Sequence, residues 1–125
     1  MIKNILFVGI GGATGSILRY LTSFYTAKYY AGSFPLATFG VNILGCFLIG
    51  IFIGLSGSYF PLNNNLKLLL ITGFCGGYTT FSTFAMENVN LIDYNNWWVA
   101  VLYIIASILL GIFAVWIGLV LGSSL

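Results

Sequence analysis

Four long apolar runs, separated by short polar stretches, set the pattern of the chain. They cover about residues 2–25, 36–55, 66–89 and 97–121. Each run holds roughly the 20 residues that an α-helix needs to cross the apolar core of a bilayer, which is about 30 Å thick. The pattern therefore predicts an all-α, multi-pass protein of the cell membrane, with residues 1–125 forming a single transmembrane domain.

The stretches between the runs carry the signals that end and begin helices. Residues 28–34 predict the first loop, with Ser33 and Pro35 as the cap and first turn of the second helix. A proline and three consecutive asparagines predict a loop over residues 56–65. Residues 90–96 predict the last loop, so both ends of the chain should lie on the same side of the membrane.

The third run is interrupted near its middle. Residues 73–84 read Gly-Phe-Cys-Gly-Gly-Tyr-Thr-Thr-Phe-Ser-Thr-Phe, which is rich in helix breakers and hydroxyl groups. The flanking segments, 66–74 and 81–89, are each too short to cross a bilayer alone. Non-helical backbone at this depth must be buried in protein or line a watery cavity, and discontinuous membrane helices often carry ion or substrate sites. We therefore predict a third helix that is broken in the middle of the membrane.

Composition excludes several classes of protein. The chain is 60% hydrophobic and 5% charged, with a mean hydropathy of +1.06. The net charge of +2 is spread over Lys3, Arg19, Lys28 and Lys67, which leaves no basic cluster that would bind nucleic acid. The sequence has no His and only two acidic residues, so we expect no enzyme activity.

Small residues recur four positions apart in two of the runs. Gly11 and Gly15 in the first run, and Gly50 and Gly54 in the second, each leave one helical face bare. Such faces let the backbones of neighbouring membrane helices approach closely.

The few basic residues specify almost no orientation. Lys3 and Lys67 fall on one predicted side, against Lys28 on the other, which Arg19 joins if its side chain extends to that surface. Because an excess of Lys and Arg marks the cytoplasmic side, this balance predicts dual topology. Two copies of opposite orientation would form an antiparallel homodimer that reproduces the inverted repeats of many transporters.

The spans hold neutral hydrogen-bond donors in place of ionised groups. The set is Thr38, Asn42, Thr79, Thr80, Ser82, Thr83, Tyr103 and Ser107. Such donors can replace the water around a small anion and still release it. The positive edges of Phe81 and Phe84 suit an anion as well.

For several of these residues a structural role remains open. Asn42 can bond a neighbouring helix, the two phenylalanines can serve packing, and Tyr103 with Ser107 can hold helices together. Arg19 can extend to the headgroups or attract anions at an opening. Glu87 and Asp93 are expected at or beyond a membrane edge, which leaves no deep carboxylate for proton coupling.

Three motifs together resemble the Fluc (CrcB) fluoride-channel family. They are the 73–84 segment, Gly-Gly-x-x-Gly-x-x-x-Arg-Tyr at 11–20 and Val-Asn-x-x-Gly-x-Phe-x-x-Gly at 41–50. The resemblance implies a dual-topology antiparallel homodimer with two pores. It also implies passive export of F⁻ with selectivity over Cl⁻, which protects the cell against fluoride toxicity. It further implies a structural Na⁺ at the dimer centre, held by the main-chain carbonyls of Gly76 and Thr79.

The resemblance also assigns roles to individual residues. The pore aromatic pair matches Phe81 and Phe84, and the pore asparagine matches Asn42. Ser82 and Thr83 belong to the same lining, together with Thr38 on the face of Asn42. Arg19 and Glu87 match vestibule positions near the aqueous openings. Tyr103 and Ser107 match a polar track on the fourth helix, and Gly111 stands where some relatives have a further hydroxyl.

Two other functions are compatible with four spans in so short a chain. A small multidrug-type, proton-coupled exporter shares the size and dual topology, but it relies on a buried Glu in the first span, which is absent here. A passive subunit of a larger assembly is the third possibility. The partners expected for the channel are fluoride, a second copy of the chain and membrane lipid.

Overall fold

Every regular element in the described part of the chain is helical. The computed structural model describes residues 1–58 and 61–125. The elements are α1 (Ile2–Tyr29), α2 (Leu36–Ser56), α3 (Asn64–Lys67), η1 (Leu68–Cys75), α4 (Gly76–Tyr78), α5 (Phe81–Asp93) and α6 (Trp97–Ser124). The prediction of an all-α protein is thereby confirmed for the residues described.

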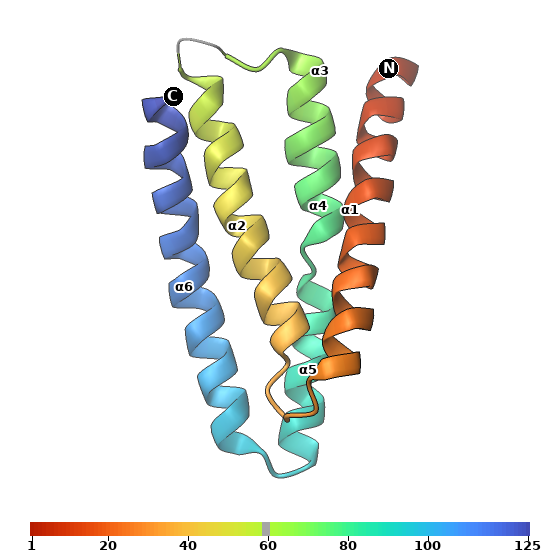
Figure 1. Ribbon diagram of the computed structural model, residues 1–125, viewed down its shortest axis with the longest axis vertical. Coiled ribbons are helices and arrows are strands. Elements are labelled where there is room, and N and C mark those ends of the chain that lie inside the picture. The colour runs from red at the N-terminus through yellow and green to blue at the C-terminus, as the bar shows by residue number, and fades with distance from the viewer. Residues whose placement is uncertain (59–60) are drawn as a thin grey trace.

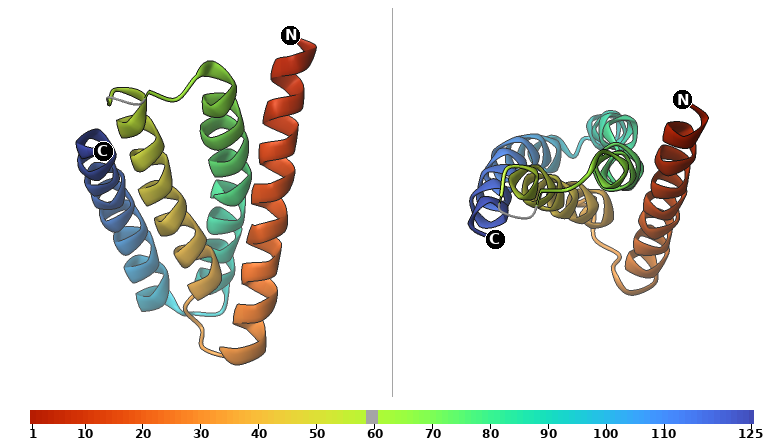
Figure 2. Two further views of the ribbon diagram at one scale, coloured as in Figure 1. Left: turned by 45° about the horizontal axis from the view of Figure 1, so that its top comes forward. Right: turned by 90° about the horizontal axis from the view of Figure 1, so that it is seen from above.

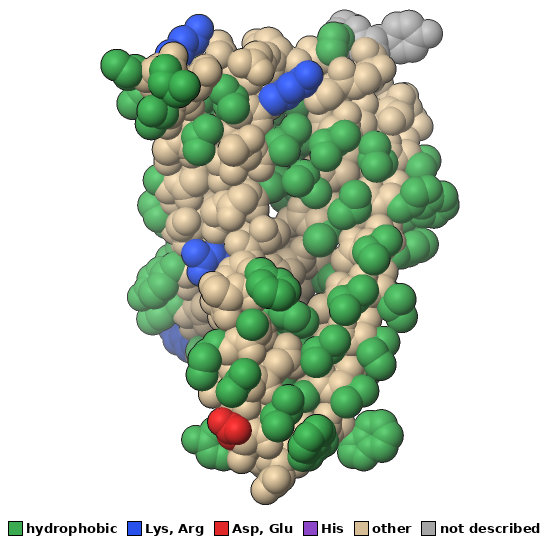
Figure 3. Space-filling model, turned by 180° about the vertical axis from the view of Figure 1, so that it is seen from behind, with side chains coloured by type: hydrophobic (Ala, Val, Ile, Leu, Met, Phe, Trp, Pro, Cys, Tyr) green, Lys and Arg blue, Asp and Glu red, His purple; other side chains and the backbone are tan. Residues whose placement is uncertain are grey.

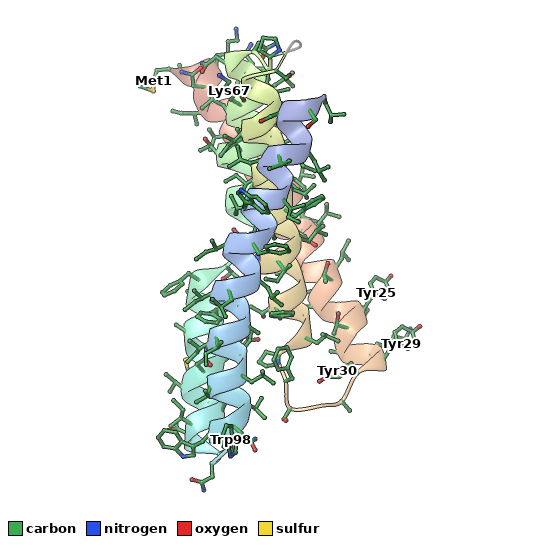
Figure 4. All side chains as sticks on the ribbon, turned by 90° about the vertical axis from the view of Figure 1, so that its left-hand side faces the viewer. Met1, Tyr25, Tyr29, Tyr30, Lys67 and Trp98 are labelled. Atoms are coloured by element: carbon green, nitrogen blue, oxygen red, sulfur yellow. The ribbon has the colours of Figure 1, made fainter. Side chains whose placement is uncertain are left out.

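Among the described residues, four helical segments are long and apolar enough to cross a membrane. They are Ile2–Tyr29, Leu36–Ser56, Asn64–Asp93 and Trp97–Ser124. Both termini lie at one end of the molecule (Figure 1). Met1 and Lys67 mark that end and Trp98 marks the opposite one (Figure 4), as expected for an even number of crossings.

Several helix ends differ from those expected from the sequence. α1 continues to Tyr29, so Lys28 belongs to its last turn and not to the loop. Pro35 occupies the N-cap of α2 without any side-chain cap, and Ser33 plays no part in it. α5 likewise continues through residues 90–93. Hydropathy marks where a helix leaves the membrane core, whereas its backbone pairing can continue into polar sequence until a residue turns away.

The helices pack as two pairs. α2 lies along α6, and α1 lies along the third span from α3 to α4 (Figures 1 and 2). The predicted small-residue contacts are present: a Cβ atom on Gly54 would lie 2.6 Å from the Leu119 carbonyl oxygen, and one on Gly15 would lie 2.8 Å from the Tyr78 amide nitrogen. Gly118 and Gly122 of α6, which were not predicted from the sequence, face Gly50 and its neighbours.

The buried core is small, as suits a protein that turns apolar side chains outward. It centres on Leu91, Ala100 and Tyr103, with Phe34 and Phe84 packed against it. Hydrophobic side chains extend over most of the face drawn in Figure 3, and a hollow opens between the third span and α6. The third span and α6 therefore enclose one side of the site described next.

Candidate functional site

The helical geometry of the third span is interrupted at two residues. Thr79 has φ −85° and ψ 158°, and Thr80 has φ −150° and ψ 119°, both extended. α4 ends just before them and α5 begins just after, with the Thr80 hydroxyl accepting from the amide of Thr83 at 3.3 Å. Thr80 thus occupies the N-cap of α5, a position that threonine favours.

The interruption is narrower than the glycine-rich segment 73–84 led us to expect. Gly73, Gly76 and Gly77 are helical, and no described glycine has a positive φ. Gly73 and Gly77 are needed for contact, because a Cβ atom on either would lie within about 3 Å of the backbone at Gly12. The segment before α4, η1, has the wider π-helical geometry, which is frequent at functional sites.

Asn42 of α2 binds the second residue of the interruption, Thr80. Its Nδ2 donates to the carbonyl of Thr80 at 3.1 Å, and its Oδ1 accepts from the amide of Thr80 at 2.8 Å. The side-chain amide therefore supplies the Thr80 amide with an acceptor in place of the Gly76 carbonyl, and it donates to the Thr80 carbonyl as well. Of the alternatives for Asn42, bonding to a neighbouring helix is realised in this chain.

Arg19 of α1 binds the backbone just before the interruption. Its Nε donates to the carbonyl of Gly77 at 3.0 Å, at the C-terminal end of the first half of the span. The side chain is half-buried and lies at the level of the interruption. The structure does not place it in the pocket that opens at the end of the helices.

The interruption releases the carbonyl of Gly76. In a continuous helix this oxygen would accept from the amide of Thr80, which here donates to Asn42 instead. Gly76 is exposed, and no atom lies within 4 Å of where its Cβ would be. The Cα of Gly76 therefore faces open space.

A groove of about 590 Å³ runs along this part of the molecule. Four of the predicted pore residues line it, namely Asn42, Phe81, Phe84 and Ser107. Gly76 and Thr79, the predicted metal-binding residues, line it as well. The structure thus brings together, on one concave surface, residues from α2, α4, α5 and α6 and from the interruption itself.

Not every predicted pore residue lines the groove. Ser82 and Thr83 lie at the N-terminus of α5, where the hydroxyl of Thr80 donates to that of Thr83 at 3.1 Å and lies 3.5 Å from that of Ser82. Three hydroxyl groups therefore gather at the positive end of the α5 dipole. Gly111 lies near Cys46, whose sulfur would be 3.5 Å from a Cβ atom at that position.

Ser107 holds an unused hydrogen-bonding group. Its Oγ is buried and, within residues 1–58 and 61–125, has no hydrogen-bond partner. The same holds for Oδ1 of Asn88, a buried residue that the sequence analysis did not single out. Because Ser107 lines the groove, its hydroxyl is available to a small ligand there.

Thr38, Glu87 and Tyr103 form a cluster that the sequence did not reveal. The Thr38 hydroxyl donates to Oε2 of Glu87 at 2.8 Å, and the Tyr103 hydroxyl donates to Oε1 at 2.8 Å. Tyr103 is fully buried and Thr38 is 4% exposed. Two buried hydroxyl groups therefore bind the carboxylate of Glu87, whose place at or beyond a membrane edge stays a prediction.

Glu87 also lines a separate pocket at the end of the helices. This mouth pocket has a volume of about 420 Å³ and includes Ser23, Tyr30, Phe34 and Asn96 among its lining residues. Tyr25, Tyr29 and Tyr30 project near the same end of the molecule (Figure 4). Glu87 thus connects the pocket at the end of the helices with the buried hydroxyl groups behind it.

Aromatic rings link this cluster to the interruption. The ring centroids of Phe81 and Phe84 are 5.8 Å apart, and those of Phe84 and Tyr103 are 4.9 Å apart in an edge-on arrangement. Phe34, which the sequence analysis did not select, meets Tyr103 edge-on at 5.3 Å. Phe81 itself is 79% exposed in the single chain, on the groove side.

Comparison with known proteins places these features in a family. The family model described as CrcB-like protein, Camphor Resistance (CrcB), matches residues 6–119. The chain is 47% identical over 123 residues to a fluoride-specific ion channel FluC of Flavobacterium psychrophilum, covering 98% of this chain and 99% of the relative. It is 48% identical over 121 residues to the protein of the same name in Azobacteroides pseudotrichonymphae, covering 97% of each. A third relative of that name, from Phocaeicola vulgatus, is 44% identical over 117 residues. Matched over nearly its whole length by both the family model and these relatives, the chain belongs to the CrcB-like family.

Proposed function

We propose that this chain is a subunit of a fluoride-selective channel that lets F⁻ leave the cell passively. The observation that carries the proposal is its similarity, at 44–48% identity and over at least 94% of its length, to relatives named fluoride-specific ion channels. The names of these relatives describe channels and not enzymes, in line with the sequence. A potential negative inside drives an anion outward by about 2.3 kcal/mol per 100 mV, so export needs no other energy source.

The chemistry of the groove supports an anion pathway. Ser107 offers an unpaired hydroxyl, and the exposed ring of Phe81 offers its positive edge. The N-terminus of α5, with the hydroxyls of Thr80, Ser82 and Thr83, adds positive potential. From the groove, an anion would pass Phe84 to reach Tyr103 and Thr38, and then the mouth pocket beside Glu87.

The exposure of Phe81 supports an antiparallel, dual-topology homodimer. The ring of Phe81 is exposed beside an open groove. A second copy of the chain would cover this ring and close the groove. With Arg19 at the depth of the interruption, Lys3 and Lys67 at one end are opposed by Lys28 at the other. A difference of one cation barely orients the chain, so both orientations should be made.

The carbonyls of Gly76 and Thr79 fit a structural Na⁺ at the centre of that dimer. Sodium is a hard cation that prefers oxygen ligands, and the Gly76 oxygen has lost its usual amide partner. Both residues line the groove, and equivalent carbonyls of a second copy would double the number of ligands. When bound, the ion would supply fixed positive charge close to the anion pathway.

Proton-coupled export of a lipophilic cation is the alternative that the channel proposal must exclude. Glu87 is a carboxylate inside a span, but its two oxygens already accept hydrogen bonds from Thr38 and Tyr103. The first span has no acidic residue. The relatives named above give this alternative no support.

Efflux from liposomes tests the proposal. Purified protein in liposomes loaded with KF should release F⁻, measured with a fluoride electrode, when valinomycin dissipates the potential. Liposomes loaded with KCl should release almost no Cl⁻ under the same conditions. Efflux that requires a pH gradient, or equal release of the two halides, would refute the proposal.

A further inference from the structure

The Arg19 side chain is directed toward the third span and not toward the end of its own helix. α1 continues to Tyr29, which places about 15 Å of helix between Arg19 and that end. The guanidinium group instead turns toward the third span and bonds the carbonyl of Gly77 at 3.0 Å. It is absent from the lining of the mouth pocket.

The bonded carbonyl is one that the interruption leaves without its usual donor. In a continuous helix the oxygen of Gly77 would accept from the amide of Phe81, which here starts a separate helix. Carbonyls at a helix C-terminus carry partial negative charge, and a cation there is stabilising. Arg19 therefore satisfies both the hydrogen-bonding and the electrostatic requirement of this end.

We infer that Arg19 is a positioning residue that holds the interruption in its conducting geometry, and does not act as a vestibule charge. Arg19 fixes the Gly77 peptide from α1, while Asn42 fixes Thr80 from α2. The two residues thus hold the backbone on either side of Thr79 from two different helices. The inference rests on the proposed function, because it assigns Arg19 a part in the same conduction site.

The two roles make different demands on the side chain. A vestibule charge acts through its field, so it depends on the charge alone and weakens as salt shortens the Debye length from about 10 Å at 0.1 M to about 3 Å at 1 M. A positioning residue depends on a donor at the place of Nε, with little dependence on salt because the contact is partly buried.

Two substitutions separate these roles. Arg19→Gln removes the charge but keeps an N–H donor the same number of bonds from Cα as Nε. Arg19→Met removes both the charge and the donor from a side chain of similar length.

We expect Arg19→Met to lower F⁻ efflux about tenfold or more at both ionic strengths, since a lost hydrogen bond from a charged donor corresponds to at least that factor. Arg19→Gln should stay within about threefold of the wild type at 1 M salt. Lys28→Met is the matched control, because it removes a cation from the same helix away from the interruption.

The result that would overturn the inference is equal loss in the Gln and Met variants at low salt, with recovery of both at high salt. Wild-type rates in Arg19→Met would overturn it as well. If Arg19→Met does not yield folded protein, the Arg19→Gln variant alone tests the inference. Loss of F⁻ efflux in Arg19→Gln at 1 M salt would refute the positioning role.

Amide hydrogen exchange gives a readout that does not require conduction. We expect the amides of residues 79–83 to exchange faster in Arg19→Met than in Arg19→Gln, and the same exchange rate in both would contradict the inference. A wild-type protein that releases no F⁻ would refute the proposed function, while this comparison would still decide the role of Arg19.

Discussion

Asn42 and Thr80 exchange two hydrogen bonds across the space between α2 and the interrupted span. The donor–acceptor distances are 3.1 Å from Nδ2 to the Thr80 carbonyl and 2.8 Å from the Thr80 amide to Oδ1. One side chain thus satisfies the backbone that the interruption leaves unpaired at a depth where lipid offers no partner.

Substitution of Asn42 should therefore damage both stability and conduction. Asn42→Ala removes the acceptor of the Thr80 amide and a donor to its carbonyl, and we expect a loss of about 1–3 kcal/mol in unfolding free energy. Asn42→Asp keeps one acceptor but sets a second oxygen against the Thr80 carbonyl. Each variant should lower F⁻ efflux about tenfold or more. Full efflux in both would remove Asn42 from the site, and Asn4→Ala, at the exposed start of α1, is the control.

Tyr103 and Thr38 should act on Glu87 as a coupled pair, since they donate to the two oxygens of one carboxylate. Tyr103→Phe keeps the ring contacts, and Thr38→Val keeps the shape of the side chain. We expect each to slow F⁻ efflux several-fold and to lower the unfolding free energy by about 1–2 kcal/mol. The double variant, measured with both singles as a mutant cycle, should show a coupling of about 0.5 kcal/mol or more. Strict additivity would indicate that the two hydroxyls do not share a carboxylate in the membrane.

The sequence predicted those features of the fold that depend only on the length and spacing of residues along the chain. The lengths of the apolar runs determine the number of spans, and the described part of the chain has four helical segments that could cross a membrane. Gly11, Gly15, Gly50 and Gly54 were identified as contact faces because their spacing alone leaves a bare stripe on a helix. Helix ends were less predictable, since residues 26–29 contain no glycine or proline that would stop α1.

Features that depend on side chains meeting across the fold could not be predicted. Arg19 and Gly77 are far apart in sequence, and no local pattern links the arginine to that carbonyl. The inward turn of Glu87 depends on hydroxyls from two other helices. Local sequence predicts that the glycines of 73–77 break the helix, whereas Gly73 and Gly77 allow close contact with α1 and remain helical.

Phe81 and Phe84 should respond differently to substitution by isoleucine. Phe81 is 79% exposed in the single chain, so Phe81→Ile should slow F⁻ efflux sharply while changing the stability of the protomer by no more than about 0.5 kcal/mol. Phe84 meets Tyr103 edge-on, so Phe84→Ile should slow efflux and also remove about 0.5–1.5 kcal/mol of ring contact.

Efflux and thermal unfolding of the two variants in detergent measure these effects. Phe113→Ile is the control, because Phe113 is exposed on α6 away from the groove. Wild-type efflux in Phe81→Ile would contradict a role for that ring in conduction.

The α2–α6 contact should be sensitive to a single methyl group. A Cβ atom on Gly118 would clash with the backbone of Phe47 and lie 2.9 Å from the amide nitrogen of Ile51. Gly118→Ala should therefore lower the unfolding temperature, at a cost of about 1–3 kcal/mol. Gly40→Ala, where nothing lies within 4 Å, should be neutral or stabilise α2 by up to about 1 kcal/mol. Equal unfolding temperatures for the two variants would argue against close packing of α2 on α6.

Dual topology can be tested with two variants biased in opposite directions. One carries Lys3→Gln, Lys67→Gln, Ala31→Lys and Asp93→Lys, which gathers the cations at the Lys28 end; the other carries Lys28→Gln and Asn64→Lys, which gathers them at the Lys3 end. Because Lys and Arg are retained on the cytoplasmic side, each variant should insert in a single orientation.

If two opposed copies form the channel, each variant expressed alone should give little F⁻ efflux, and the two expressed together should restore it. Restoration distinguishes a topological requirement from damage to the site, since neither chain regains its own missing charges. Residues 31, 64 and 93 were chosen because they are exposed and outside the groove and the mouth pocket. Full efflux from either variant expressed alone would show that chains of one orientation suffice, and the antiparallel dimer would have to be abandoned.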